Sequence, residues 1–231
     1  MDNFYFQKKI KKLNFNNIFY PTDTSRLLIN IAKKYLKKKQ KILDLGCGGG
    51  VVTYFLYNRE LYQDFYLSDI SSLAIIRAKA NLKKKINATF CEGNLFKPWS
   101  GKKFDLIIND VSGVSSEIVK ISNWFNYAPS DKTKSGIGLL KKVILQSKNY
   151  LYSNSLIILP IISLSNVRSG LNFLKKKLHV VQIKKFYWPM PEYLAKKIDI
   201  MLKLKKKNFI DFERKYGIVV CYTLIVVCKK K

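Results

Sequence analysis

Residues 41–50, with the sequence KILDLGCGGG, decide the fold of this chain. Lys41–Leu45 is a short apolar run of the kind that forms a buried strand, and a glycine-rich turn follows it directly. Glycine suits a turn that lies against a ligand, because a Cβ would collide with the ligand or strain the positive φ that the turn requires. A helix is expected next, near Val52–Asn58. The stretch therefore predicts a strand, a ligand-binding turn and a helix in succession.

The same alternation of strands and helices extends in both directions from this stretch. The expected strands lie at residues 41–45, 65–69, 88–91, 104–109, 155–160, 178–186 and 218–227. The other expected helices lie at residues 22–39, 72–85, 138–151 and 167–177. This pattern is typical of an α/β fold with a seven-stranded, mostly parallel sheet, helices on both faces and an antiparallel last strand.

Two segments depart from the alternation. Residues 111–135 form the longest stretch without a clear period, and loops of such length are usually functional or mobile. Residues 187–191 (YWPMP) are expected to form a rigid turn, followed by a basic helix or loop at residues 192–207. No internal repeat or linker is visible, so residues 1–231 are expected to form a single domain.

The charge of the chain is strongly unbalanced, with 43 Lys and Arg residues against 15 Asp and Glu and a formal net charge of +28. Such a field attracts polyanions, which indicates nucleic acid or ribosomes as partners. The alternative is compositional drift, since Lys, Asn, Ile, Phe and Tyr are abundant while Arg is rare, as an A/T-rich genome would produce. Compositional drift should also increase the number of Glu residues, and Glu is scarce. Polyanion binding and compositional drift therefore both stay open as explanations of the charge.

The cysteines Cys47, Cys91, Cys221 and Cys228 form no CxxC pair, and we expect reduced core thiols in a cytoplasmic protein. With His179 as the single histidine, the sequence offers no ligand spacing for a metal. The N-terminal residues alternate aromatic side chains with lysine and lack the apolar core of a signal peptide. The longest apolar runs are too short to cross a bilayer, so neither secretion nor membrane insertion is expected.

The glycines of the turn have the spacing GxGxG, at Gly46, Gly48 and Gly50. A turn that binds a pyrophosphate has the pattern GxGxxG and would need glycine at position 51, which is Val51. An acidic residue, Asp44, stands two positions before the first glycine. The spacing therefore disfavours a dinucleotide, which leaves a nicotinamide reductase as a distant alternative.

This arrangement resembles motif I of the class I S-adenosylmethionine-dependent methyltransferases, which have a Rossmann-like fold. Their cofactor has no phosphate and presents a sulfonium and an amino-acid group, so the resemblance implies that Asp44 suits the positively charged end. It also implies that Asp69, at the end of the second strand, accepts hydrogen bonds from the ribose hydroxyls. Simple capping roles at a strand end and a helix start are the alternatives for these two residues.

Residues 91–96 (CEGNLF) resemble the third loop of that family, where Asn94 would hydrogen-bond the adenine amine. An ordinary turn is the alternative. The cofactor-binding set that the resemblance implies is Thr22, Asp44, Gly46, Cys47, Gly48, Gly50, Asp69, Ile70, Asn94, Leu95 and Asn109.

Residues 104–112 (FDLIINDVS) align with the strand that ends in Asn-Pro-Pro-Tyr in family members that methylate amino or amide nitrogens. In those enzymes the side-chain amide holds the target nitrogen and an aromatic residue stacks on the substrate, and such positioning supplies much of the rate. This chain retains Asn109 but has Asp110, Val111 and Ser112 in place of the prolines and the aromatic residue. Asn109 and Asp110 are the catalytic candidates that follow. Asp110 could take a proton from the acceptor, or it could be a solvated turn residue.

Residues 18–28 (IFYPTDTSRLL) look like the segment before motif I in the small-domain group, which includes release-factor glutamine methyltransferases and ribosomal and transfer RNA methyltransferases. In that group the segment folds over the cofactor, and an ordinary capped helix is the alternative. The resemblance implies a helical segment over the cofactor at residues 1–40, a cofactor-binding core at 41–165, and C-terminal strands with a basic excursion at 166–231.

Trp124, in the long irregular segment, and Trp188 are the candidate substrate contacts. Trp188 could stack on a nucleobase, as aromatic side chains beside cationic grooves do, or it could pack the turn. Three functions stay open. The first is methyl transfer from S-adenosylmethionine to RNA or to a translation-associated protein. The second is methyl transfer to a small molecule, and the third is a catalytically silent module that binds the cofactor or RNA.

Overall fold

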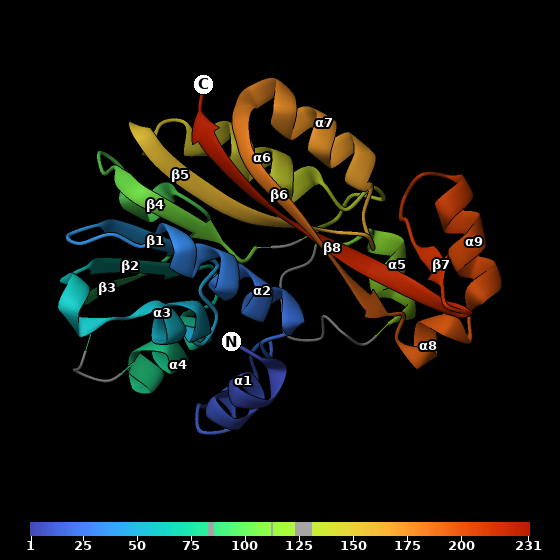
Figure 1. The fold of residues 1–231 in the computed structure, drawn as a ribbon, viewed down its shortest axis with the longest axis horizontal. Helices are drawn as coiled ribbons and strands as arrows, with labels where there is room; N and C mark the ends of the chain where they lie inside the picture. Colours follow the sequence, from blue (N-terminus) through green and yellow to red (C-terminus); the bar gives the residue numbers. More distant parts are fainter. Residues whose placement is uncertain (83–85, 112, 123–130) are drawn as a thin grey trace.

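The computed structural model describes residues 1–82, 86–111, 113–122 and 131–231. Its centre is one sheet with the strand order β3-β2-β1-β4-β5-β8-β6, and the short β7 pairs with β8 (Figure 1). The strands are β1 Lys41–Leu45, β2 Asp64–Asp69, β3 Ala88–Glu92, β4 Phe104–Asn109, β5 Leu151–Ile162, β6 Leu178–Pro189, β7 Glu213–Lys215 and β8 Ile218–Lys230. Neighbours among β1 to β5 pair in parallel, whereas β8 runs antiparallel to β5, β6 and β7. The predicted mostly parallel α/β sheet with an antiparallel last strand is confirmed.

Helices cover both faces of this sheet. They are α1 Asn3–Ile10, α2 Asp23–Ala32, α3 Val51–Leu56, α4 Ser72–Leu82, α5 Ser116–Ile121, α6 Gly138–Ser147, α7 Val167–Lys177, α8 Glu192–Ala195 and α9 Ile198–Lys206. Successive side chains of a strand point to opposite faces, so Ile42 packs with residues of α1 to α4 while Leu43 packs with residues of α6 and α7. In Figure 1, α6 and α7 lie above the sheet, and α3 and α4 lie below it.

Residues 190–217, which contain α8, α9 and β7, form what we call the C-terminal lobe. Its apolar side chains Met201, Leu204 and Phe212 pack with Ile118 of α5 and Cys221 of β8 in a cluster of their own. The lobe and α5 lie together at one end of the molecule, where the parallel strands have their carboxyl ends (Figure 1). The lobe therefore stands at the edge of the sheet where α/β proteins bind ligands.

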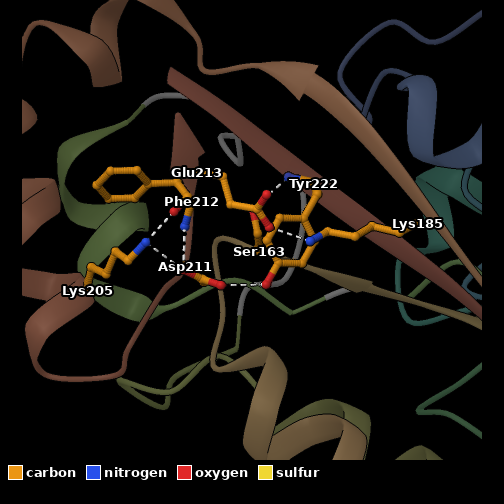
Figure 2. Close-up of polar contacts among 7 residues, drawn as sticks. All are labelled: Ser163, Lys185, Lys205, Asp211, Phe212, Glu213 and Tyr222. Atoms are coloured by element: carbon orange, nitrogen blue, oxygen red, sulfur yellow. Dashed lines mark hydrogen bonds and ion pairs between the residues drawn. The ribbon is translucent and has the colours of Figure 1, made fainter. Parts of the chain in front are cut away.

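A polar network attaches the C-terminal lobe to the sheet (Figure 2). The Tyr222 hydroxyl of β8 donates to Oδ2 of Asp211 at 2.6 Å, and the Asp211 N–H donates to the carbonyl of Ser163 at 2.6 Å. Nζ of Lys205 lies 3.0 Å from Oδ1 of Asp211. Lys185 of β6 likewise forms an ion pair with Glu213. Both acidic side chains of the network, Asp211 and Glu213, are therefore paired with a lysine.

The predicted rigid turn at residues 187–191 is wrong for its first three residues, because β6 continues to Pro189. Residues 187–189 pair with residues 220–222 of the long strand β8. Pro189 has no N–H to donate, but it is the last residue of a strand at the edge of the sheet, where proline is tolerated. The sheet also contains β7, a three-residue strand that the sequence did not reveal.

The helix expected at residues 22–39 ends at Ala32 and is followed by a 3₁₀ turn at Lys33–Tyr35. The segment 111–135, expected to be irregular, contains α5, whose N-cap Ser115 accepts a hydrogen bond from the N–H of Glu117. Residues 112 and 123–130 of that segment lie outside the described residues. Helix α6 ends at Ser147, earlier than expected, and β5 is correspondingly longer.

Candidate active site

A cavity opens at the carboxyl ends of β1, β2 and β4, where the sequence motifs converge. It holds about 1090 Å³ of free space, including its open mouth. Eight of the predicted site residues line it: Gly46, Cys47, Gly48, Asp69, Ile70, Asn94, Leu95 and Asp110. Thr22, Asp44, Gly50 and Asn109 also belong to the described residues but are not part of the lining.

The glycine turn is fixed to the end of β2 by its backbone. The N–H groups of Gly46 and Cys47 donate to the carbonyl of Ser68 at 2.8 and 3.0 Å. Gly46 has a φ of +74°, and a Cβ there would lie only 2.2 Å from Cγ2 of Val111. Close packing against Val111 and the left-handed backbone together require glycine at this position.

Asp69, the last residue of β2, brings its carboxylate to the same turn. Its Oδ2 accepts a hydrogen bond from the Gly48 N–H at 2.9 Å, and its Oδ1 accepts one from the Ser71 N–H at 3.0 Å. The carboxylate is half-buried and also lines the cavity. Each carboxylate oxygen has two acceptor positions, so each can take a further hydrogen bond from a ligand.

Asp44 is fully buried next to this turn. Its Oδ2 accepts hydrogen bonds from the hydroxyl of Thr53 at 2.8 Å and from the Thr53 N–H at 3.2 Å. Its Oδ1 is buried and has no hydrogen-bond partner among the described residues. Burial raises the pKa of Asp44 to about 7, and the nearby charge of Asp69 adds to this rise while the bonds from Thr53 oppose it.

Asp110 lies at the end of β4 and faces the cavity. The Ser25 hydroxyl, in the first part of α2, donates to its Oδ2 at 2.6 Å. Burial raises the pKa of Asp110 to about 7, against the hydrogen bond from Ser25 and with a contribution from the charge of Asp44. The sequence did not single out Ser25, because a serine in the first turn of a helix is usually part of its cap.

Asn109 is fully buried beside Asp110. Its Nδ2 donates to the carbonyl of Val111 at 3.1 Å, which fixes the plane of the amide. Its Oδ1 is buried without a hydrogen-bond partner among the described residues. The geometry thus holds an unused acceptor directly behind the cavity wall.

The segment before β1 forms another wall of the cavity. Its contributions are Ile18, Phe19, Pro21 and Ser25. Phe15 packs against the glycine turn, since a Cβ on Gly49 would lie 2.7 Å from its ring. Thr22 caps α2 by accepting a hydrogen bond from the Thr24 N–H at 3.3 Å.

The two predicted aromatic contacts lie elsewhere or cannot be placed. Trp188 is on β6, where its Nε1 donates to Oγ1 of Thr223 at 3.1 Å, and it packs against the apolar cluster of the C-terminal lobe. It does not belong to the cavity lining that the structure describes. Trp124 lies outside the described residues.

The charge of the cavity is opposite to that of the protein. Two carboxylates, Asp69 and Asp110, line it, whereas no Lys, Arg or His of the described residues does so. Asp44 adds a third acid directly behind the lining. In a chain with 43 Lys and Arg residues against 15 Asp and Glu, this exclusion of cations favours a positively charged ligand over a phosphate-bearing one.

The cysteines Cys47, Cys91, Cys221 and Cys228 are free. Burial raises the pKa of the Cys47 thiol well above its ordinary value, with a further contribution from Asp44, so this cavity thiol is a poor nucleophile. No group of three or more His, Cys, Asp or Glu side chains within the described ranges could hold a metal ion.

Helices of a length and hydrophobicity that would cross a membrane are absent from the described part of the chain.

Comparison with known proteins gives a consistent result. The model of the family described as "Methyltransferase domain" matches residues 36–193. A protein of Methanocaldococcus jannaschii, provisionally named as a protein N5-glutamine methyltransferase, is 30% identical over 161 residues, which cover 68% of this chain and 79% of that protein. The ribosomal protein L11 methyltransferase of Thermosipho africanus is 32% identical over 134 residues, and the match covers 57% of this chain and 48% of that enzyme.

Among solved structures, the Thermus thermophilus 16S rRNA N2 G1207 methyltransferase in complex with S-adenosylmethionine and guanosine has the same fold, with a TM-score of 0.52 and 13% identity. The likeness covers 92% of this chain and 44% of that one. The family match spans more than half of the chain and contains the glycine turn and most of the cavity lining. The chain therefore belongs to the methyltransferase domain family and is a class I S-adenosylmethionine-dependent methyltransferase.

Proposed function

We propose that this methyltransferase transfers the methyl group of S-adenosylmethionine to RNA or to a protein of the translation apparatus, in the cytoplasm. The observation that carries the choice of cofactor is the charge of the cavity, which has two carboxylates and no described cation in its lining. S-adenosylmethionine is positively charged at its sulfonium and at its ammonium group. A dinucleotide would instead bring its negative pyrophosphate against Asp69 and Asp110.

The residues of the cavity fit this cofactor in three respects. Asp69 has acceptor positions left for the ribose hydroxyls after it has bonded Gly48 and Ser71. A Cβ on Gly48 would meet nothing within 4 Å among the described atoms, which leaves room for a ligand against the backbone. Oδ1 of Asp44 is a buried acceptor without a partner in the described part of the chain, and a nearby cationic group would offset its cost.

The adenine side of the proposed site is formed by the loop after β3. Asn94 is exposed and lines the cavity, and its amide oxygen can accept a hydrogen bond from an amine. Leu95 next to it has a φ of +52° and is buried, and the Gly93 N–H ties the loop to the carbonyl of Asp69 at 2.8 Å. We assign Asn94 to the adenine amine and Leu95 and Ile70 to its apolar faces.

The N-terminal residues 1–40 are proposed to close the cofactor into the cavity, in front of the core at residues 41–165. Support comes from Ile18, Phe19, Pro21 and Ser25, which line the cavity, and from Phe15, which packs on the glycine turn. We propose that Thr22 acts through its cap of α2, which sets the direction of the helix that carries Ser25.

The methyl group that the cofactor supplies is electrophilic, so the protein has to orient and deprotonate the acceptor. We assign proton removal to Asp110, because Ser25 bonds one oxygen of its carboxylate and the side chain faces the cavity. A pKa of about 7 suits a group that takes up a proton near neutral pH. We propose that Asn109, which is buried behind the lining, contributes to orienting the acceptor N–H or O–H through Val111, which lines the cavity and whose carbonyl accepts a hydrogen bond from Asn109 Nδ2.

A macromolecular acceptor is supported by two independent observations. The net charge of +28 attracts polyanions such as RNA and ribosomes. The relatives named above are named for a protein glutamine, a ribosomal protein and a ribosomal RNA. The basic excursion within residues 166–231 would then contact the macromolecule, and we keep Trp124 and Trp188 as candidate contacts to it.

The test is incubation of the protein with methyl-labelled S-adenosylmethionine and fractionated cell extract, followed by ribonuclease or protease treatment. The proposal predicts label in ribosomal RNA or in a translation-associated protein, and a rate reduced about 100-fold by Asn109→Ala. Asn149→Ala, which removes an exposed amide after α6, is the control and should leave the rate unchanged.

Label that appears only in small metabolites would contradict the proposal and favour a small-molecule methyltransferase. Tight cofactor binding without label in any fraction would contradict it in another way. That result would favour a silent binding module, in which the replacement of Asn-Pro-Pro-Tyr by Asn-Asp-Val-Ser has removed the activity.

A further inference from the structure

A groove between α6 and α7, which also reaches Asn208 of the C-terminal lobe, lies apart from the cofactor cavity. Three cations line it, Lys141, Arg168 and Lys176, and its described lining contains no acidic side chain. The groove holds about 850 Å³ of free space, including open solvent. It is therefore a polar, positively charged depression, in contrast to the acidic and more apolar cofactor cavity.

Three of the polar side chains that α7 contributes form a row along the helix. Arg168, Asn172 and Lys176 are four residues apart from one another, and residues at this spacing lie one above the other on the same face of a helix. A rise of 1.5 Å per residue separates successive members by about 6 Å along the helix axis. All three side chains are exposed. The row thus offers hydrogen-bond donors at regular intervals to an extended ligand.

Acidic side chains do not neutralise the described cations of the groove, and a ring contact holds one of them, Lys141. Nζ of Lys141 lies 5.4 Å from the centre of the Phe173 ring, a cation–π contact between α6 and α7. None of the three cations forms an ion pair with an acid of the described residues. Their charges are consequently available to a ligand.

Helix α6 contributes to both the groove and the cavity. Leu139, in the first turn of that helix, lines the cofactor cavity, and Lys141, two residues later, lines the groove. Residues two apart project to opposite sides of a helix, so α6 separates the groove from the cavity by about one helix diameter of 10 Å, a distance that an extended RNA strand can span.

We propose that the α6–α7 groove binds the phosphate backbone of RNA, on the other side of α6 from the cofactor cavity. RNA carries one anion per nucleotide at regular intervals, which matches the row of donors on α7 better than the irregular carboxylates of an acidic protein do. Arg and Lys bond phosphate oxygens, and amide side chains such as Asn172 bond both phosphate and sugar. This inference rests on the proposed function, because it selects RNA from the two classes of acceptor, RNA and protein, that are proposed above.

The test compares two double variants that lose the same charge from the same two helices. Lys141→Gln/Lys176→Gln removes two cations of the groove, and Lys142→Gln/Lys175→Gln removes their exposed neighbours outside it. Binding of a fluorescein-labelled single-stranded RNA of about 20 nucleotides is followed by anisotropy over a series of salt concentrations. A polyglutamate of similar length serves as the competitor.

For the groove variant, we expect RNA affinity to fall about 10-fold and the slope of log K against log salt to decrease by about 1.4, as for two phosphate contacts on a single strand. The control variant should keep most of the affinity and slope, and polyglutamate should compete only weakly. Equal losses in both variants, no loss in either, or polyglutamate competition equal to that of unlabelled RNA would each overturn the inference.

Two further measurements distinguish an error in the groove inference from an error in the proposed function. Calorimetry should give the same S-adenosylmethionine affinity for the groove variant and the wild type, so a loss of cofactor binding would contradict a role confined to RNA. If labelled methyl goes only to protein and both variants bind RNA equally, the groove inference falls while the proposed function stands. If RNA binds through the groove but no fraction is methylated, the proposed function falls and the groove stands.

Discussion

The acids of the cofactor cavity and the acids of the C-terminal lobe have opposite surroundings. In the lobe, Asp211 pairs with Lys205 and Glu213 pairs with Lys185, and the pKa of each carboxyl is lowered. In the cavity, Asp44 and Asp110 are bonded by the hydroxyls of Thr53 and Ser25, and burial raises the pKa of each to about 7.

Cations are abundant in this chain, so their exclusion from the cavity requires an explanation. Lysine side chains surround the lobe acids, while apolar residues, glycines and small hydroxyl residues surround the cavity acids. Unpaired buried carboxylates cost free energy in the empty protein. A ligand that carries positive charge would recover this cost on binding, and we infer that the cavity suits such a ligand.

The largest effect should come from adding one methyl group to the glycine turn. Gly46→Ala places a Cβ 2.2 Å from the Val111 side chain at a φ of +74°, and we expect the free energy of unfolding to fall by about 3 kcal/mol or more. Gly217→Ala, at the turn into β8, has a φ of +78° with nothing within 4 Å among the described atoms and should cost only about 1 kcal/mol. Equal losses in urea unfolding would show that backbone strain alone, and not the packing of the cavity, makes glycine necessary.

The pH dependence of stability should differ in sign between the two regions. The pKa of Asp44 is raised in the folded protein, so the free energy of unfolding should fall as pH rises from about 4 and level off above about 7. Asp44→Asn should remove the part of this fall that Asp44 contributes, leave the part that Asp110 contributes, and stabilise the cofactor-free protein at about pH 8 by about 2–4 kcal/mol. The pKa of Asp211 is lowered, so its contribution should be present above about pH 4 and lost in acid.

Thermal unfolding without cofactor between about pH 4 and pH 8 measures both effects, with Asp211→Asn as the variant for the lobe. Destabilisation of the protein by Asp44→Asn at about pH 8 would contradict the idea that the buried charge is a cost which the cofactor offsets.

Removal of one negative charge should affect cofactor affinity in the cavity but not in the lobe. Asp69→Asn should weaken S-adenosylmethionine binding about 10- to 100-fold, because Asp69 bonds the Gly48 N–H and faces the cavity. Asp211→Asn removes the same charge from the lobe and should leave cofactor affinity unchanged in calorimetry. Similar affinities for both variants would break the assignment of the cavity as the cofactor site.

The smallest effect is expected in the lobe network. Lys185→Met removes the ion pair between Lys185 and Glu213. Because these two side chains are 35% and 33% exposed, the free energy of unfolding should fall by only about 0.5–1 kcal/mol. The loss should shrink at high salt, because partly exposed pairs are screened. A loss above about 2 kcal/mol in urea unfolding, or a change in cofactor affinity, would mean that the network also supports the cavity.

The elements around the glycine turn were predictable because their signals are local. The apolar run at Lys41–Leu45 and the glycines after it specify a strand and a turn without reference to the rest of the chain, and β1, β2 and β4 appear where expected. The C-terminal region was harder, because β7 and the last part of β6 depend on pairing with the distant strand β8. A proline-rich pentapeptide carries no local sign of that pairing.

The residues of the candidate site also divide into those with a local sequence signal and those that depend on distant contacts. Gly46, Asp69 and Asp110 line the cavity and were named from motif positions alone. The role of Ser25 depends on a contact between α2 and Asp110, the residue after β4, which joins residues 85 positions apart, and no spacing rule reveals such a contact. The roles of the site residues in binding and catalysis stay predictions.

The most direct test is calorimetric titration of the wild-type protein with S-adenosylmethionine at about pH 6 and about pH 7.5, and with NAD at the higher pH. We predict saturable binding of S-adenosylmethionine that is several-fold tighter at the higher pH, where Asp44 and Asp110 are largely ionised, and no binding of NAD. Binding of NAD, or an S-adenosylmethionine affinity that does not increase between the two pH values, would contradict a cavity whose unpaired carboxylates select a cationic cofactor.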